Sequence, residues 1–129
     1  MTTLTLLLAA LLFGGMTFFS FGFAPVLFAQ LPEAQVRPLL RGTFPYYYLA
    51  VIALSGVTAL AAAFVSTPAA IIIGSICVTT LYARQILMPR INAASDAGDK
   101  RAFGLRHGAS VVLQLIQIGL AAWALVLLA

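Results

Sequence analysis

The chain has 129 residues, of which 63% are hydrophobic and only 8% are charged, and its mean hydropathy is +1.09. A soluble domain carries about 25% charged residues, so this composition excludes an ordinary water-soluble protein and indicates lipid as the solvent. The net charge of +4 comes from few groups that flank apolar stretches, so we expect no nucleic-acid partner. The single Cys77 excludes an intramolecular disulfide.

Four stretches reach the roughly 20 apolar residues that a transmembrane helix needs. Because the chain is short, we expect them to form a single domain, residues 1–129, with spans at about residues 3–29, 46–65, 69–88 and 107–128. The first stretch has no Lys or Arg before it and exceeds the ~7–15 residues of a signal-peptide core, so we expect a retained helix. Pro25 should kink that helix, because proline removes a backbone donor.

A polar segment, QLPEAQVRPLLRGTFP, joins the first two spans, and we expect a short interfacial helix within it at residues 33–41. Three tyrosines, Tyr46 to Tyr48, begin the second span, where aromatic rings suit the headgroup level. The short uncharged turn at Ser66–Pro68 should tie spans two and three into a hairpin.

Pro89 is expected to stop the third span, and a charged loop at residues 90–106 should follow. Within it, Asp96-Ala97-Gly98-Asp99 has the composition of a turn. The fourth span should then begin at His107.

The seven Lys and Arg residues all lie in or beside the two loops that join spans one to two and three to four. Basic residues stay on the cytoplasmic side of a membrane. The sequence therefore predicts an all-α membrane protein, an antiparallel bundle of four transmembrane helices, with both termini outside and the two charged loops in the cytoplasm.

A polar stripe runs along the fourth span. Spacings of 3, 4 and 3 residues put His107, Ser110, Gln114 and Gln117 on one helical face. An unpaired amide in hydrocarbon costs several kcal/mol, so this face should point at other helices. We interpret Ser110, Gln114 and Gln117 mainly as interhelical hydrogen-bonding groups, and a ligand or ion site along the stripe is the alternative.

A second set of polar residues is expected at the cytoplasmic edge. Arg84, the one charge inside a span, could extend to the interface or turn inward and pair with an acid. Asp96 should accept hydrogen bonds from Arg84, Arg41 or a backbone donor. We call the candidate set the polar cap, and its members are Arg41, Arg84, Asn92, Asp96 and His107. The simpler alternative is a solvated loop whose charges only enforce topology.

Signals for catalysis and metal binding are weak. A neutral imidazole at His107 could ligate a metal or haem, but no residue spacing resembles a metal motif, and no nucleophile elbow or phosphate loop is present. We therefore predict no catalytic residues, metal or cofactor. Small residues such as Gly14, Gly15 and Gly74 are expected to allow close helix packing.

Several motifs, in order, resemble a known family. They are LFGGMTFFSFGFAPVLFAQLP, RGTFPYYY, and LMPRINAASDAGD followed by RHGAS. This order resembles the uncharacterised four-helix membrane proteins that include transmembrane protein 205 and a large set of bacterial relatives. The matching positions are Gly14, Gly15, Pro25, Arg41, Pro45, Tyr47, Pro89, Asn92, Asp96, His107 and Ser110.

The resemblance has two departures. Many relatives carry Leu where this chain has Arg106 and Asn where it has Gln114. The resemblance implies the four-helix architecture and a bacterial inner membrane, and it brings no settled activity.

Three functions are compatible with these features. The first is a structural or accessory subunit that packs against other membrane proteins or associates with itself, which the small polar portions and small-residue faces favour. The second is a small oligomeric transporter or ion-handling protein that uses the polar stripe. The third is a haem or redox protein that uses His107 from two subunits.

Overall fold

The computed structural model describes all 129 residues, and every regular element is helical. Short π-helical segments, η1 and η2, join consecutive α-helices without a break. The elements in chain order are α1 (Thr2–Thr17), η1 (Phe18–Phe23), α2 (Ala24–Gln30), α3 (Glu33–Ala63), α4 (Thr67–Tyr82), η2 (Ala83–Leu87), α5 (Met88–Asp96) and α6 (Lys100–Leu128). They make four continuous helices, each long and apolar enough to cross a membrane.

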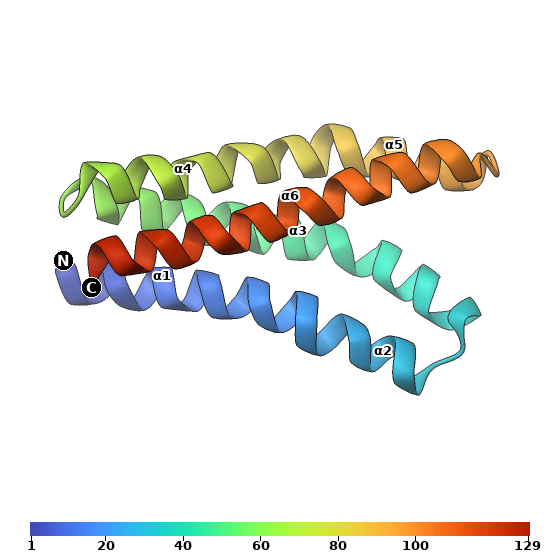
Figure 1. The fold of residues 1–129 in the computed structure, drawn as a ribbon, viewed down its shortest axis with the longest axis horizontal. Helices are drawn as coiled ribbons and strands as arrows, with labels where there is room; N and C mark the ends of the chain where they lie inside the picture. The colour runs from blue at the N-terminus through green and yellow to red at the C-terminus, as the bar shows by residue number, and fades with distance from the viewer.

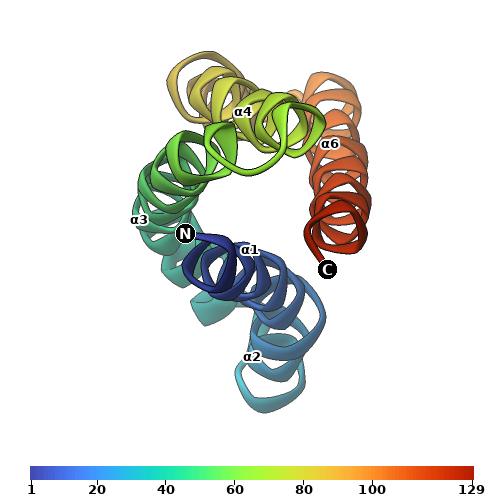
Figure 2. The same cartoon turned by 90° about the vertical axis from the view of Figure 1, so that its left-hand side faces the viewer.

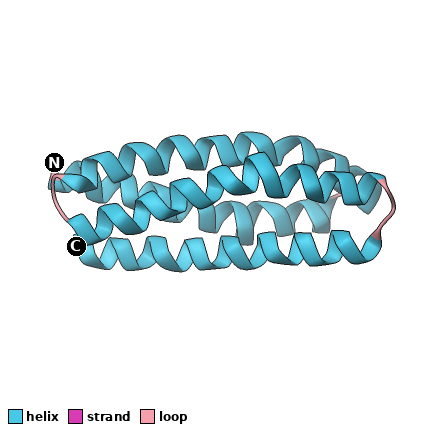
Figure 3. Ribbon diagram, turned by 90° about the horizontal axis from the view of Figure 1, so that it is seen from above, coloured by secondary structure: helices cyan, strands magenta, loops and turns pink.

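The four continuous helices lie alongside one another. Figure 1 shows both termini at one end, with the turn between α3 and α4, while the α2–α3 and α5–α6 connections lie at the other. Seen from the end with the termini, α1, α3, α4 and α6 form a ring (Figure 2). α3 packs against α4 and α1, and α6 packs against α4, α1 and α5. Only short loops interrupt the helices (Figure 3).

Pro25 and Pro89 lie inside continuous helices, each just after a π-helical segment, and explain those two segments. The expectation that Pro89 stops the third span is wrong, because the helix continues through it to Asp96. Just before it, the Met88 N–H donates to the Ala83 carbonyl, five residues back. The same pattern precedes Pro25. Proline has no N–H and crowds the preceding turn, and a wider turn accommodates it without ending the helix.

The polar segments are also more helical than expected. The interfacial helix at residues 33–41 and the second span are one helix, α3, with Pro38 and Pro45 inside it. The long loop expected at residues 90–106 is wrong, because α5 runs to Asp96 and α6 begins at Lys100, before His107. The connection therefore shrinks to Ala97–Asp99.

The turn expected at Asp96–Asp99 is confirmed. Gly98 adopts a φ of 71°, which glycine accepts at no steric cost. The Asp99 N–H donates to the Ala94 carbonyl, which closes the end of α5. The Asp99 side chain then accepts from the Ala102 N–H and caps α6. This turn fixes where α6 starts, and so the positions of the polar side chains along it.

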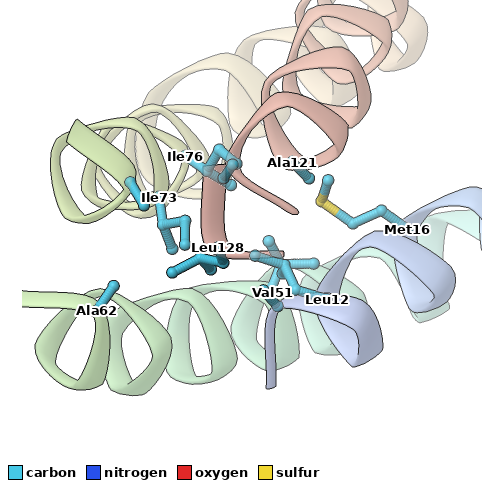
Figure 4. Close-up of a cluster of buried hydrophobic side chains, with 11 residues drawn as sticks. Leu12, Met16, Val51, Ala62, Ile73, Ile76, Ala121 and Leu128 are labelled. Carbon is cyan, nitrogen blue, oxygen red and sulfur yellow. The ribbon is translucent and has the colours of Figure 1, made fainter. Parts of the chain in front are cut away.

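The apolar core lies mainly in the half of the bundle that carries the termini. Figure 4 shows Leu12 of α1, Ile73 and Ile76 of α4 and Leu128 of α6 converging there. Several alanines complete this cluster and let the backbones approach, namely Ala9, Ala62, Ala69, Ala121 and Ala124. Each apolar span window buries only 22–33% of its residues inside the chain, so most apolar side chains face outward.

Candidate functional site

The polar side chains of the spans meet one another in the half of the bundle away from the termini. Gln117 is buried, and its amide nitrogen donates to the hydroxyls of Thr79 at 2.8 Å and Thr80 at 3.0 Å on α4. An amide placed in hydrocarbon needs such partners. Gln117 therefore connects α6 to α4 at the border of the apolar core.

Gln114, about one turn before Gln117 on α6, connects three helices. Its amide nitrogen donates to the hydroxyls of Ser20, in η1, and Tyr47, in α3. The Tyr47 ring stacks on Phe19, with the ring centroids 4.0 Å apart, and Phe44 packs edge-on against the same pair. Aromatic contacts of this kind add directional attraction to apolar packing, so they help to fix how α3 lies against η1.

Tyr48 makes the next contact toward the charged end. Its hydroxyl shares a 3.1 Å hydrogen bond with the Ser110 hydroxyl. The three tyrosines expected at the headgroup level differ in burial within the bundle, because Tyr48 is buried and Tyr47 is half-buried. Tyr46 alone is largely exposed. Consecutive residues on a helix point about 100° apart, so the three rings cannot share one environment.

Arg41 and Asp96 form a bidentate ion pair between α3 and the end of α5. The two guanidinium nitrogens lie 2.7 and 2.9 Å from the two carboxylate oxygens. Both residues lie beyond the apolar stretches at 46–65 and 69–88. The Arg41 hydrogen bond lowers the pKa of the Asp96 carboxyl below its usual value. Both side chains are solvent-exposed, so the pair ties α3 to α5 at a surface that water reaches.

Arg84 has a different partner from the acid that the sequence suggested. Its Nε donates to the Pro45 carbonyl of α3 at 3.2 Å, and its terminal nitrogen contacts the neighbouring Gln85. Asp96 pairs with Arg41 instead, and Glu33 pairs with Arg37. Arg84 thus binds α3 through the backbone.

A pocket of about 80 Å³ lies between α3, α5 and α6, beside the Tyr48–Ser110 contact. Its apolar lining comes from residues such as Phe44 and Met88, and its polar lining from Arg41, Tyr48, Asn92, His107, Ser110 and Gln114. Three members of the polar cap and two of the polar stripe therefore surround one cavity. Arg84, Asp96 and Gln117 do not line it.

His107 lies inside α6 and is mostly exposed, with its ring stacked on Phe103 at 5.4 Å. No group of three or more His, Cys, Asp or Glu side chains comes together in the chain. The polar groups in and around the pocket can bind a small polar group by hydrogen bonds and charge.

A family model described as a domain of unknown function (DUF4149) matches residues 7–100 of the chain. The chain belongs to this family. No curated protein and no solved structure matches it. The DUF4149 match runs from α1 to the start of α6, so it includes Arg41, Asn92 and Asp96, whereas His107, Ser110 and Gln114 lie beyond it.

The sequence predicted only some of the aromatic residues of this DUF4149 protein's site. Tyr48 shares a helical face with Ser55 and Thr58, a spacing that predicts an inward-facing partner for the polar stripe, and its hydroxyl does meet Ser110. Sequence reasoning missed Phe19 and the inward contacts of Tyr47, whose rings stack against each other.

Proposed function

We propose that this protein is a structural or accessory subunit that packs with other membrane proteins. In this proposal it crosses a bacterial inner membrane four times as an antiparallel bundle, with both termini outside and the charged end in the cytoplasm. The distribution of Lys and Arg supports the sidedness, because basic residues are retained on the cytoplasmic side. The polar cap then fastens α3 to α5 on that face.

One observation carries the proposal. Gly14 and Gly15 lie on the exposed surface of α1, and no atom of another helix lies within 4 Å of where a Cβ would stand. The sequence had suggested that these glycines pack tightly, but no helix of this chain covers them. Glycine weakens a helix by up to about 1 kcal/mol and gains close packing only if another helix approaches. A helix from another chain would supply that contact.

The polar groups support the same function. The amides of Gln114 and Gln117 and the hydroxyl of Ser110 bind side chains on other helices of the same chain. They hold the protein together and leave an outer surface that is mostly apolar, with bulky residues such as Leu7, Leu11 and Phe18 around the glycines. Such a surface suits contact with lipid and with other transmembrane helices.

Purification from native membranes tests the proposal. Tagged protein at native abundance, extracted in a mild detergent, should elute with a second component. That component is either another protein or a second copy, and native mass spectrometry tells them apart. Gly15→Leu should remove it and leave the thermal stability of the purified chain unchanged. Gly119→Leu, the same change at an exposed glycine of α6, is the control and should retain it. A wild-type protein that elutes alone would contradict the proposal.

The pocket favours one alternative, a small transporter or ion-handling protein. Arg41, Asn92 and His107 line it with Ser110 and Gln114 of the polar stripe, so a small polar solute could bind there. Flux into proteoliposomes that carry the purified protein tests this. Transport that Asn92→Leu abolishes, in a variant that still folds, would favour the alternative over a subunit role.

A further inference from the structure

A groove of about 390 Å³ runs along the outside of the bundle, on a different surface from the pocket. Val78 and Tyr82 of α4 and Leu87 of η2 form one wall, and Ala109 and Leu113 of α6 form the other. The volume falls within the roughly 300–1,000 Å³ typical of ligand sites. All but one of its six lining residues are hydrophobic, so its interior suits a hydrocarbon chain.

The charged end of the groove carries two arginines. Arg106 precedes Ala109 by three residues on α6, and Arg90 follows Leu87 by three residues, so both lie about one turn beyond the groove. The Arg106 Nη1 donates to the Arg90 carbonyl at 3.1 Å, which places the two residues side by side. The remaining guanidinium donors make no hydrogen bond to another side chain.

Each acid of the chain already has a partner. Glu33 pairs with Arg37, and Asp96 pairs with Arg41. The Asp99 side chain caps α6. Five of the seven cations therefore have no carboxylate partner, and they are Arg84, Arg90, Lys100, Arg101 and Arg106. All five lie on η2, α5 and α6, and the only acid there without a cation partner is Asp99, so this corner of the molecule carries a net positive charge.

We propose that an anionic phospholipid binds here, with an acyl chain in the Val78–Leu113 groove and its phosphate against Arg90 and Arg106. An apolar groove that ends at a membrane-edge arginine pair matches the two parts of such a lipid. Basic pockets between transmembrane helices are known to take anionic headgroups, and arginine forms strong charge-assisted hydrogen bonds to phosphate. The proposal is independent of whether the protein joins a larger complex.

Lipid binding measured by native mass spectrometry tests this. The purified chain is titrated with phosphatidylglycerol and, separately, with phosphatidylcholine of identical acyl chains. We expect the wild type to prefer phosphatidylglycerol. An Arg90→Gln, Arg106→Gln double variant should lose about 30-fold in affinity for that lipid, since each basic residue near anionic headgroups contributes roughly fivefold. Arg37→Gln removes one charge at the same end on α3 and should change little.

A second variant tests the groove without touching charge. Ala109→Phe should fill it and weaken binding of both lipids, whereas Val112→Phe, which introduces the same side chain at an exposed neighbour outside the groove, should not. This test remains informative even if the double arginine variant folds poorly.

Four results would overturn the proposal. One is equal affinity of the wild type for the two lipids. Another is a preference that survives in the double arginine variant. The third is a second copy of the chain or a protein helix in the groove, seen as a dimer or complex that Ala109→Phe dissolves. The fourth comes from melting temperatures: phosphatidylglycerol should raise that of the chain, and an equal rise with inorganic phosphate at matched concentration would reject the acyl-chain groove.

Discussion

The two ends of the bundle are held together by different forces. At the end with the termini, Leu12, Ile73 and Leu128 pack among alanines, and no ion pair is present. At the charged end, the helices meet through hydrogen bonds and the Arg41–Asp96 ion pair. Lipid tails are as apolar as leucine, so only close van der Waals packing holds the first end together. Water competes for the exposed Arg41–Asp96 pair, and hydrogen bonds between membrane helices average only about 0.6 kcal/mol, so each contact at the second end is weak.

The two halves should therefore contribute differently, one to the stability of the bundle and the other to the relative positions of its helices. Packing in the apolar half should supply most of the free energy that holds the helices together. The polar contacts are directional, so they should set the register of α6 against α3 and α4. Substitutions in the two halves should therefore differ in size and in kind.

Ile73→Ala should have the largest effect. Ile73 is fully buried in the core, and removing part of it should lower the free energy of unfolding in detergent by about 2 kcal/mol, because its neighbours lose van der Waals partners. The control is Ile71→Ala, the same change at a residue that is 67% exposed to the outside, and it should cost under about 0.5 kcal/mol. Equal losses from both variants would contradict a packed core.

Gln117→Leu should cost less, about 1 kcal/mol, because hydrogen bonds between membrane helices average about 0.6 kcal/mol and this amide makes two. Insertion into the membrane should be intact, since lipid accepts leucine. Adding Thr80→Val to the variant should cost little more, because the shared contact is already lost. If a lipid-soluble probe labels position 117, the residue faces lipid and this account of the stripe fails.

A double-mutant cycle on Arg41 and Asp96 should give a small but measurable coupling, because both side chains are exposed but the pair is bidentate. The single variants are Arg41→Gln and Asp96→Asn. The same cycle on Arg84 and Asp96 should give no coupling, since Arg84 binds the Pro45 carbonyl. Coupling of Asp96 to Arg84 instead would restore the pairing suggested by the sequence.

The smallest effect should be a pH dependence. The pKa of Asp96 is lower in the folded protein than in the unfolded chain, so the unfolded state binds this proton more readily. The stabilisation from the pair is present above the unfolded pKa of about 3.9 and is lost as the pH falls through the folded pKa. Melting temperatures of wild type and Asp96→Asn should differ at pH 6 and converge in acid. A difference in melting temperature that grows as the pH falls would contradict the lowered pKa of Asp96.

The sequence predicted the number of spans and the inward face of α6, because hydropathy and a helical repeat depend only on local composition. It misplaced the ends of the helices. Pro45 and Pro89 were treated as boundaries, which is sound in water, but in a membrane the cost of unpaired backbone groups keeps the helix continuous through a proline. Because α3 and α5 continue beyond the apolar spans, both Arg41 and Asp96 lie on helices.

Partner choice in the polar cap could not be predicted, because it depends on how two long helices rotate against each other. Arg84 and Arg41 were equally plausible partners for Asp96 on charge alone. The packing of Tyr47 on Phe19 and the hydrogen bond from Gln114 to Tyr47 orient α3, and this orientation presents Arg41 to Asp96. These are contacts between residues far apart in the sequence, which local patterns do not reveal.

We propose that the charged end faces the cytoplasm and the end with the termini faces outward. Single cysteines at Ala97 and Ala129, introduced in a Cys77→Ala background, test it with a membrane-impermeant maleimide on spheroplasts. We predict that Ala129→Cys is labelled at once, and that Ala97→Cys, in the turn before α6, is labelled only after the membrane is permeabilised. Labelling of Ala97→Cys from outside, with Ala129→Cys protected, would reverse the orientation and contradict the account.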